Sequence, residues 1–204
     1  MTVLYDYWRS SAAYRVRIAL NLLHLPHTAV PVNLLDREHK GPDNLARNPQ
    51  GLVPTLEIDG LTLTQSLAII EYLNDTRGGL LPADAPGRAR VRALSHAVAM
   101  EIAPVCNLSV RNHVASLTGG AFTADDWQRH YIGAGLAALE QMLEAPQTGR
   151  FCHGDAVTMA DLCLAPQVYN ARRVGFDATS WPRIAGSWQI SRRSPPCRRP
   201  IPMR

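Results

Sequence analysis

Residues 5–23 read YDYWRSSAAYRVRIALNLL, and the pattern of apolar residues changes in the middle of this stretch. Its beginning is rich in β-forming residues, whereas the apolar residues from Val16 to Leu23 recur at the spacing of one helix face. Ser10 and Ser11 stand where the first pattern gives way to the second. The stretch therefore predicts a strand followed by a helix, with two hydroxyl groups at the turn between them.

The rest of the first eighty residues continues this alternation. TAVPVNL predicts a second strand, placed at an edge of the sheet or at an irregularity because Pro31 cannot donate to a ladder. A short helix or loop is expected between residues 36 and 48, and two β-rich runs joined at Asp59-Gly60 are typical of a hairpin. Ser66 is the expected N-cap of the next helix. This order predicts a small mixed sheet with helices on its faces.

From Asp84 to about residue 173 the sequence has helical periodicity and almost no strand signal. We expect one long helix over residues 84–114, bent at Pro104, followed by helices that begin after Thr123 and Thr158. The predicted domains are an α/β domain at residues 1–80 and an all-helical domain at residues 86–186.

The end of the chain, residues 187–204, differs from the rest. It reads SWQISRRSPPCRRPIPMR, with four prolines and no acidic residue, and predicts a disordered tail. Its five arginines exceed the whole net charge of +4, so the body of the chain is close to neutral. A nucleic-acid partner is therefore not expected.

Several other classes of function are not expected either. The four cysteines, Cys106, Cys152, Cys163 and Cys197, form no C-x-x-C pair and no metal-ligand spacing, which favours reduced thiols and no metal. A signal-peptide pattern and a run of about eighteen apolar residues are both absent, so we expect a cytoplasmic protein with no membrane partner. There is no G-x-S-x-G sequence typical of a serine hydrolase.

Two strand-to-helix junctions carry candidate binding groups. Ser10 and Ser11 lie at one junction and Gln65-Ser66 at the other, where free N–H groups and the helix dipole favour an anion. The alternative is that these serines are ordinary helix caps. Pro54 precedes a predicted strand. It is either a cis proline, which would be structural or would expose a neighbouring backbone N–H and C=O to a ligand, or an ordinary first residue of an edge strand. Two such junctions suggest a small acidic ligand.

Three motifs occur in order along the chain: RSSAAYRVRIAL from Arg9, NPQGLVPTLEIDGLTLTQSLAIIEYL from Asn48, and GDAVTMADLCLAPQVYNARR from Gly154. They resemble the motifs of zeta-class glutathione transferases, the maleylacetoacetate isomerase family. The resemblance implies the glutathione transferase fold, with an α/β thioredoxin-like N-terminal domain, an all-α C-terminal domain, glutathione as cofactor and a homodimer.

The resemblance also implies roles for individual residues. Ser10 and Ser11 would be catalytic, because they would hydrogen-bond to the glutathione sulfur and stabilise its thiolate. Arg9 and Arg173 would bind the substrate's carboxylates. The residues implied to bind glutathione are Ser10, Ser11, Ala12, His39, Val53, Pro54, Gln65, Ser66, Asn107, Leu108 and Ser109.

The chain departs from the family pattern at three places. Ala12 stands where the family usually has Cys, which disfavours dehalogenation through a mixed disulfide but not isomerisation. Ala103 stands where His or Gln commonly precedes the proline. The tail lacks the expected acidic, alanine-rich helix, and a reading-frame shift near Gly186 would produce such a change.

The function expected from the resemblance is glutathione-dependent cis-trans isomerisation of a maleyl-type dicarboxylic acid, maleylacetoacetate or maleylpyruvate, in the breakdown of tyrosine or other aromatic compounds. Two alternatives stay open at this point. One is a general glutathione transferase that conjugates or dehalogenates small electrophiles, and the other is a glutathione-binding module without turnover.

Overall fold

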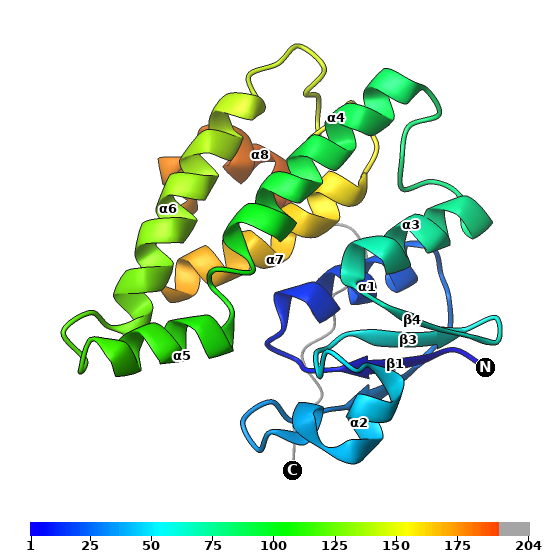
Figure 1. The fold of residues 1–204 in the computed structure, drawn as a ribbon. Helices are drawn as coiled ribbons and strands as arrows, with labels where there is room; N and C mark the ends of the chain where they lie inside the picture. Colours follow the sequence, from blue (N-terminus) through cyan, green and yellow to red (C-terminus); the bar gives the residue numbers. More distant parts are fainter. Residues whose placement is uncertain (192–204) are drawn as a thin grey trace. The chain divides into compact units, whose positions relative to one another are not determined.

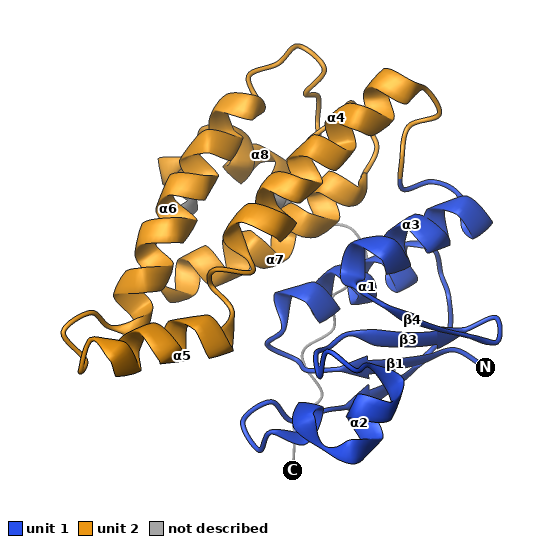
Figure 2. Cartoon of the chain, viewed as in Figure 1, with its two compact units in different colours: residues 1–80, 194–204 blue, residues 81–193 orange. Residues whose placement is uncertain are grey.

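The computed structural model of the protein describes residues 1–191, which divide into two compact units (Figure 2). The first unit spans residues 1–80, and the second begins at Leu81. The elements of the first unit are β1 (Val3–Asp6), α1 (Ser11–Leu22), β2 (Thr28–Pro31), the 3-10 helix η1 (Glu38–Lys40), α2 (Pro42–Arg47), β3 (Thr55–Ile58), β4 (Leu61–Thr64) and α3 (Ser66–Arg77). Those of the second are α4 (Ala85–His96), the π-helical segment η2 (Ala97–Ile102), α5 (Leu108–Leu117), α6 (Ala124–Met142), α7 (Met159–Arg173), the 3-10 helix η3 (Ala178–Ser180) and α8 (Pro182–Ser191).

The first unit is a four-stranded mixed sheet of order β2-β1-β3-β4, with β1 parallel to β2 and antiparallel to β3. Helices α1 and α3 lie together on one face and α2 lies on the other (Figure 1). The expected edge position of Pro31 is confirmed, because β2 is an outer strand. The expected hairpin is confirmed too: Asp59 and Gly60 both adopt left-handed backbone, with φ 52° and 79°, as its two-residue turn requires.

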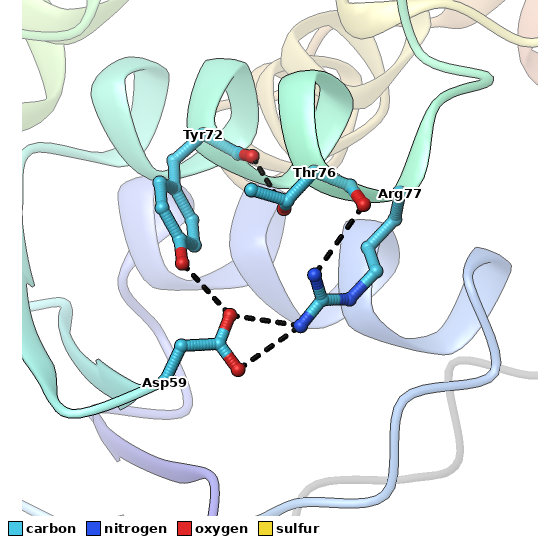
Figure 3. A network of polar contacts seen from close by, with 4 residues as sticks. All are labelled: Asp59, Tyr72, Thr76 and Arg77. Carbon is cyan, nitrogen blue, oxygen red and sulfur yellow. Dashed lines mark hydrogen bonds and ion pairs between the residues drawn. The ribbon is translucent and has the colours of Figure 1, made fainter.

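A polar network fixes the β3–β4 hairpin to α3 (Figure 3). The Asp59 carboxylate accepts a hydrogen bond from the Tyr72 hydroxyl at 2.7 Å and two from Arg77 Nη2 at 2.8 and 3.0 Å. These bonds, led by that from Tyr72, lower the pKa of Asp59. The C-terminal half of α3 is thereby held against the turn, at the opposite end of the helix from Ser66.

The second unit is built around α7, which is buried along most of its length. The helix begins at a buried capping box, in which the Asp161 carboxylate accepts hydrogen bonds from the backbone N–H and the hydroxyl of Thr158 at 2.8 and 3.0 Å. A second box, between Thr123 and Asp126, begins α6. Both predicted helix starts are confirmed. Within residues 1–191, no helix combines the length and the apolar character needed to cross a bilayer.

One long helix over residues 84–114 was the wrong expectation. The chain forms α4, continues as η2 and then turns through residues 103–107 before α5, so Pro104 lies in a break between helices rather than at a bend. Ile102 packs on Gly135 of α6, where a Cβ atom would come within 2.4 Å of the Ile102 side chain. This contact with a distant helix accompanies the end of η2.

Two smaller expectations also need correction. Ser66 is the first residue of α3 rather than its N-cap, which is Gln65. Helix α8 continues to Ser191, past the expected start of the tail at residue 187, and the Glu140 carboxylate accepts hydrogen bonds from the backbone N–H groups of Arg183 and Ile184 at its start. The rest of the predicted tail, residues 192–204, lies outside the described residues.

Candidate functional site

Segments that carry predicted residues of the first unit lie at one edge of the sheet, meaning here the end at which β1 and β4 finish and β3 begins, not an outer strand. Tyr5, Thr55 and Thr64 pair in a single row across β1, β3 and β4. Because β1 and β4 run toward this edge and β3 runs away from it, the residues after β1, before β3 and after β4 lie beyond the same row. These residues are Ser10, Val53, Pro54 and Gln65.

At the start of α1, Ser10 is the N-cap residue. Its Oγ accepts a hydrogen bond from the Ala13 N–H at 3.2 Å, and its own N–H donates to the Tyr7 carbonyl at 2.8 Å. Ser10 therefore caps α1, and a hydroxyl that accepts from Ala13 can still donate its hydrogen to a ligand. The first turn contains no acidic residue, so the positive end of the helix dipole is not offset there. Ser11 and Ala12 are half-buried in this turn.

The loop that carries Ser10 is tied to the middle of α1 by Arg17. Its Nη2 donates to the Trp8 carbonyl at 3.0 Å, and its Nε lies 3.4 Å from the Asp6 carboxylate. Burial raises the pKa of Asp6, and Arg17 partly opposes that shift. Next to Trp8, the Arg9 guanidinium lies 5.4 Å from the centre of the Trp8 ring. The loop before α1 is thus held by Arg17, which follows Ser10 in the sequence, and contains the contact of Arg9 with Trp8, which precede it.

The start of α3 is formed by Gln65, which adopts left-handed backbone with φ 66°. Its Nε2 donates to the Gln50 Oε1 at 2.7 Å, and the Gln50 carbonyl accepts a hydrogen bond from Lys40 Nζ at 3.0 Å. Ser66 is buried, and its Oγ accepts a hydrogen bond from Arg15 Nη1 at 3.2 Å. This helix start also has no acid in its first turn and no side-chain cap.

Two further predicted residues lie in the loops of the first unit. The Val53–Pro54 peptide bond is cis, as one of the two expectations for Pro54 had it, and both residues precede the first ladder pair of β3. His39 lies in η1, and its buried Nδ1 has no hydrogen-bond partner within residues 1–191. Burial, followed by the charges of Lys40 and Arg37, lowers the pKa of His39, which favours a neutral ring at pH 7.

The remaining predicted residues belong to the second unit. The Asn107 side chain caps α5 by accepting a hydrogen bond from the Leu108 N–H at 2.7 Å, and Ser109 is in the first turn of that helix. Arg173 is the last residue of α7 and is exposed. Ala103 lies in the turn after η2.

The cysteines with a shifted pKa do not provide a nucleophile. Burial raises the pKa of Cys106 to about 11 and raises that of Cys152 well above its ordinary value, so both thiols are protonated near neutral pH. Cys106, Cys152 and Cys163 are not in disulfides. Among the described residues, no cluster of three His, Cys, Asp or Glu side chains could hold a metal ion.

Sequence reasoning missed three polar residues of the site. Gln50 and Lys40 were not assigned, although Gln50 lies within the NPQGLVP motif. Arg15 was also not assigned, although a charged residue four positions before Ala19 interrupts the buried stripe of α1. That interruption was the available signal.

Known proteins match both units of the chain. A family model described as "Glutathione S-transferase, N-terminal domain" matches residues 9–76, and one described as "Glutathione S-transferase, C-terminal domain" matches residues 125–199. The maleylacetoacetate isomerase of Rhizobium meliloti (strain 1021) is 62% identical over 186 residues, which cover 90% of this chain and 87% of that protein. The chain belongs to the glutathione transferase family.

Solved structures of this family agree with that assignment. The holo structure of a maleyl pyruvate isomerase, a bacterial glutathione transferase of the zeta class, has a TM-score of 0.88 and 40% identity, with 92% of this chain and 91% of that chain covered. A maleylacetoacetate isomerase from Anaeromyxobacter dehalogenans 2CP-1, with dicarboxyethyl glutathione and citrate in its active site, has a TM-score of 0.82 and 42% identity, with coverage of 93% and 88%. The predicted fold and the resemblance to zeta-class transferases are both confirmed.

Proposed function

We propose that this glutathione transferase is a glutathione-dependent cis-trans isomerase of maleyl-type dicarboxylic acids, with maleylacetoacetate or maleylpyruvate as substrate. The observation that carries the proposal is the pair of helix starts without acidic residues, at α1 and α3, on one edge of the sheet. The 62% identity to a maleylacetoacetate isomerase, over 90% of this chain, supports the proposal.

The residues at this edge fit glutathione, an anionic peptide with two carboxylates. Three buried nitrogens have no hydrogen-bond partner in the described part of the chain: Nε and Nη2 of Arg15 and Nδ1 of His39. They suit a ligand with several hydrogen-bonding groups. Gln65 and Ser66 would hold the γ-glutamyl end, the main chain of Val53 would bind the middle of the peptide, and His39 would lie against the glycyl end. For Asn107, Leu108, Ser109 and Arg173, the roles in glutathione and substrate binding remain predictions.

When bound, glutathione supplies a sulfur nucleophile that adds reversibly to the activated double bond of the substrate, allows that bond to rotate and leaves unchanged. The task of Ser10 and Ser11 is to keep the sulfur ionised by donating hydrogen bonds, with help from the free N–H groups of α1. A thiol with a pKa of about 8.5 is roughly 3% ionised at pH 7. Lowering that pKa by about two units takes about 2.7 kcal/mol, which two hydrogen bonds to a charge plus a helix dipole can supply.

Two arginines are proposed to bind the substrate. Arg9 and Arg173 would neutralise the two carboxylates of the substrate and stabilise the negative charge that develops during the reaction. The thiols of Cys106 and Cys152 would not compete with the cofactor, because both are protonated near neutral pH. A relative that binds both citrate and a glutathione carrying a dicarboxylic group supports this pairing of ligand classes.

The test is an isomerisation assay with each maleyl acid, with and without glutathione. We expect isomerisation only when glutathione is present, with no net consumption of glutathione. Equal rates with and without glutathione would contradict the proposal. Consumption of glutathione in proportion to product would favour the conjugating transferase instead.

The double variant Ser10→Ala/Ser11→Ala separates the isomerase from a binding module without turnover. In the isomerase, kcat should fall about 100-fold or more while the Kd of glutathione changes far less, because the hydroxyls act on the ionised sulfur. A preparation that binds glutathione but turns over neither maleyl acid, before or after this change, would identify the binding module.

We further propose that the protein is a cytoplasmic homodimer. Light scattering of the purified protein measures the first part, and fractionation of the producing cells measures the second. A monomer at micromolar concentration, or recovery of the protein outside the cytoplasmic fraction, would contradict the respective part.

A further inference from the structure

Arg15 is a buried charged residue whose hydrogen bonds are mostly unmade. Its relative exposure is 3%, and it lies in the buried stripe of α1 between Ala13 and Val16. Nη1 donates to Ser66 Oγ at 3.2 Å, while Nε and Nη2 have no hydrogen-bond partner among the described residues. Burying a guanidinium whose donors lack partners lowers the stability of the fold unless an anion lies near it.

The neighbouring arginine of the R-x-R sequence serves as an internal comparison. Arg17 has partners within the protein: the Asp6 carboxylate, the Trp8 carbonyl and the face of the Tyr14 ring. The positive charge of Arg17 is therefore compensated by groups of the protein itself. No such set of partners surrounds Arg15 within the part of the chain that the structure describes.

The hydrogen bond from Arg15 fixes how Ser66 can act. A serine hydroxyl that accepts from a guanidinium directs its own hydrogen away from that donor. Ser66 is the first residue of α3, a twelve-residue helix with no acid in its first turn and no side-chain cap. The hydroxyl, the free N–H groups and the positive end of the helix all favour one ligand group, a carboxylate.

We propose that Arg15 is a positioning residue that acts through Ser66 to make the start of α3 selective for the free α-carboxylate of the γ-glutamyl group. Arg15 holds the Ser66 hydroxyl as a donor and places an uncompensated positive charge behind it. This inference rests on the proposed use of glutathione and extends it, because it names a residue that sets the selectivity for the peptide rather than the isomerisation step.

The experiment compares two peptides by calorimetry: glutathione and 4-aminobutanoyl-cysteinylglycine, which lacks only the α-carboxylate. The wild-type protein should bind glutathione at least 100-fold more tightly than the analogue. In Arg15→Met this preference should fall at least tenfold, with less than a threefold change in the affinity for the analogue. Arg15→Lys, which keeps the charge, should restore part of the preference.

A purely structural role for Arg15 gives a different result. Arg15→Met would then weaken the binding of both peptides by the same factor and leave the preference intact, which would overturn the proposal. Arg17→Met is the matched control, because it removes the other arginine of the pair, and it should affect both peptides equally.

Ser66→Asp keeps the proposal testable if Arg15→Met does not fold. The new carboxylate should pair with Arg15 and occupy the place of the ligand's carboxylate. The variant should be at least as resistant to thermal unfolding as the wild type, yet bind glutathione at least 100-fold more weakly. Unchanged affinity for glutathione in Ser66→Asp would overturn the proposal.

These measurements do not depend on turnover. A wild-type protein that prefers glutathione over the analogue but isomerises no maleyl acid would refute the proposed function and leave the role of Arg15 standing. Isomerisation by a wild-type protein that binds both peptides equally would refute the role of Arg15 alone.

Discussion

The helix starts of the two units are built differently. In the second unit, four helices begin at a carboxylate that accepts hydrogen bonds from their first N–H groups or their N-cap residue; these carboxylates are Asp84 for α4, Asp126 for α6, Asp161 for α7 and Glu140 for α8. In the first unit, α1 has only the neutral Ser10 hydroxyl, and α3 has no side-chain cap. The same positive helix end is thus used for stability at these four helices and left open to a ligand at α1 and α3.

The comparison predicts opposite consequences for changes of charge in the two units. Removing a carboxylate from a helix start of the second unit should lower the free energy of unfolding. Adding one to an open helix start of the first unit should leave stability unchanged or raise it, while binding and catalysis are lost.

The largest effect is expected for Asp161→Ala. This buried carboxylate accepts hydrogen bonds from the Thr158 N–H and hydroxyl and from the Cys152 N–H, and the change leaves these donors unsatisfied. The free energy of unfolding should fall by about 3–5 kcal/mol, measured by urea denaturation.

Asp126→Ala is the matched control for that change. It removes the carboxylate of the exposed capping box of α6, where water can replace the lost hydrogen bonds, and should lower the free energy of unfolding by much less than Asp161→Ala does. Equal losses in the two variants would show that burial of the capping box does not set its contribution.

The next effect is expected for Ser11→Asp at the start of α1. An acid in the first turn should raise helix stability by about 0.3–1 kcal/mol. The same charge repels a sulfur anion and removes a hydroxyl donor, so glutathione-dependent isomerisation should fall about 100-fold. Steady-state kinetics and urea denaturation of one preparation measure both changes.

Asn21→Asp places the same charge at the other end of α1, on an exposed residue, and is the control. It should lower stability slightly, because a negative charge is unfavourable at a helix C-terminus, and leave the rate unchanged. An equal loss of rate in both variants would mean that the position of the charge along α1 is irrelevant, against the comparison drawn above.

The smallest effect concerns the pH dependence of stability at His39. Because its pKa is lowered in the folded protein, the unfolded chain takes up a proton first as the pH falls through about 6.5, and the free energy of unfolding decreases in that window. In His39→Asn this part of the decrease should vanish between about pH 7 and pH 5.5 in a denaturation series.

Arg37→Asn tests the cause of that shift. It removes one of the positive charges that lower the pKa of His39, and asparagine tolerates the left-handed backbone at this position, where φ is 59°. The pH dependence should become weaker than in the wild type. A steeper dependence would contradict the assigned cause.

Much of the fold follows from local sequence signals. The hairpin turn at Asp59-Gly60 and the two capping boxes depend on residues that are neighbours in the sequence, so their chemistry is visible there. At the π-helical end, by contrast, Ile102 contacts Gly135, and at the start of α8 Glu140 accepts a hydrogen bond from Arg183; both contacts join residues that are distant in the sequence. Local periodicity carries no information on such contacts.

The candidate site divides in the same way. The positions of Ser10 and Gln65 at one edge could be inferred from the order of strands and helices, since strand direction decides which ends meet. The left-handed backbone of Gln65, the N-cap residue, is not a preference of glutamine and so leaves no signal in the sequence. The contact of Arg15 with Ser66 joins residues 51 positions apart and appears only once α1 and α3 pack together.

A titration of bound glutathione, followed by the ultraviolet absorbance of its thiolate, tests the central claim most directly. With the open start of α1 and the hydroxyls of Ser10 and Ser11 around the sulfur, its pKa should lie about two units below that of free glutathione. A sulfur that ionises at the same pH in the complex as in water would contradict the account.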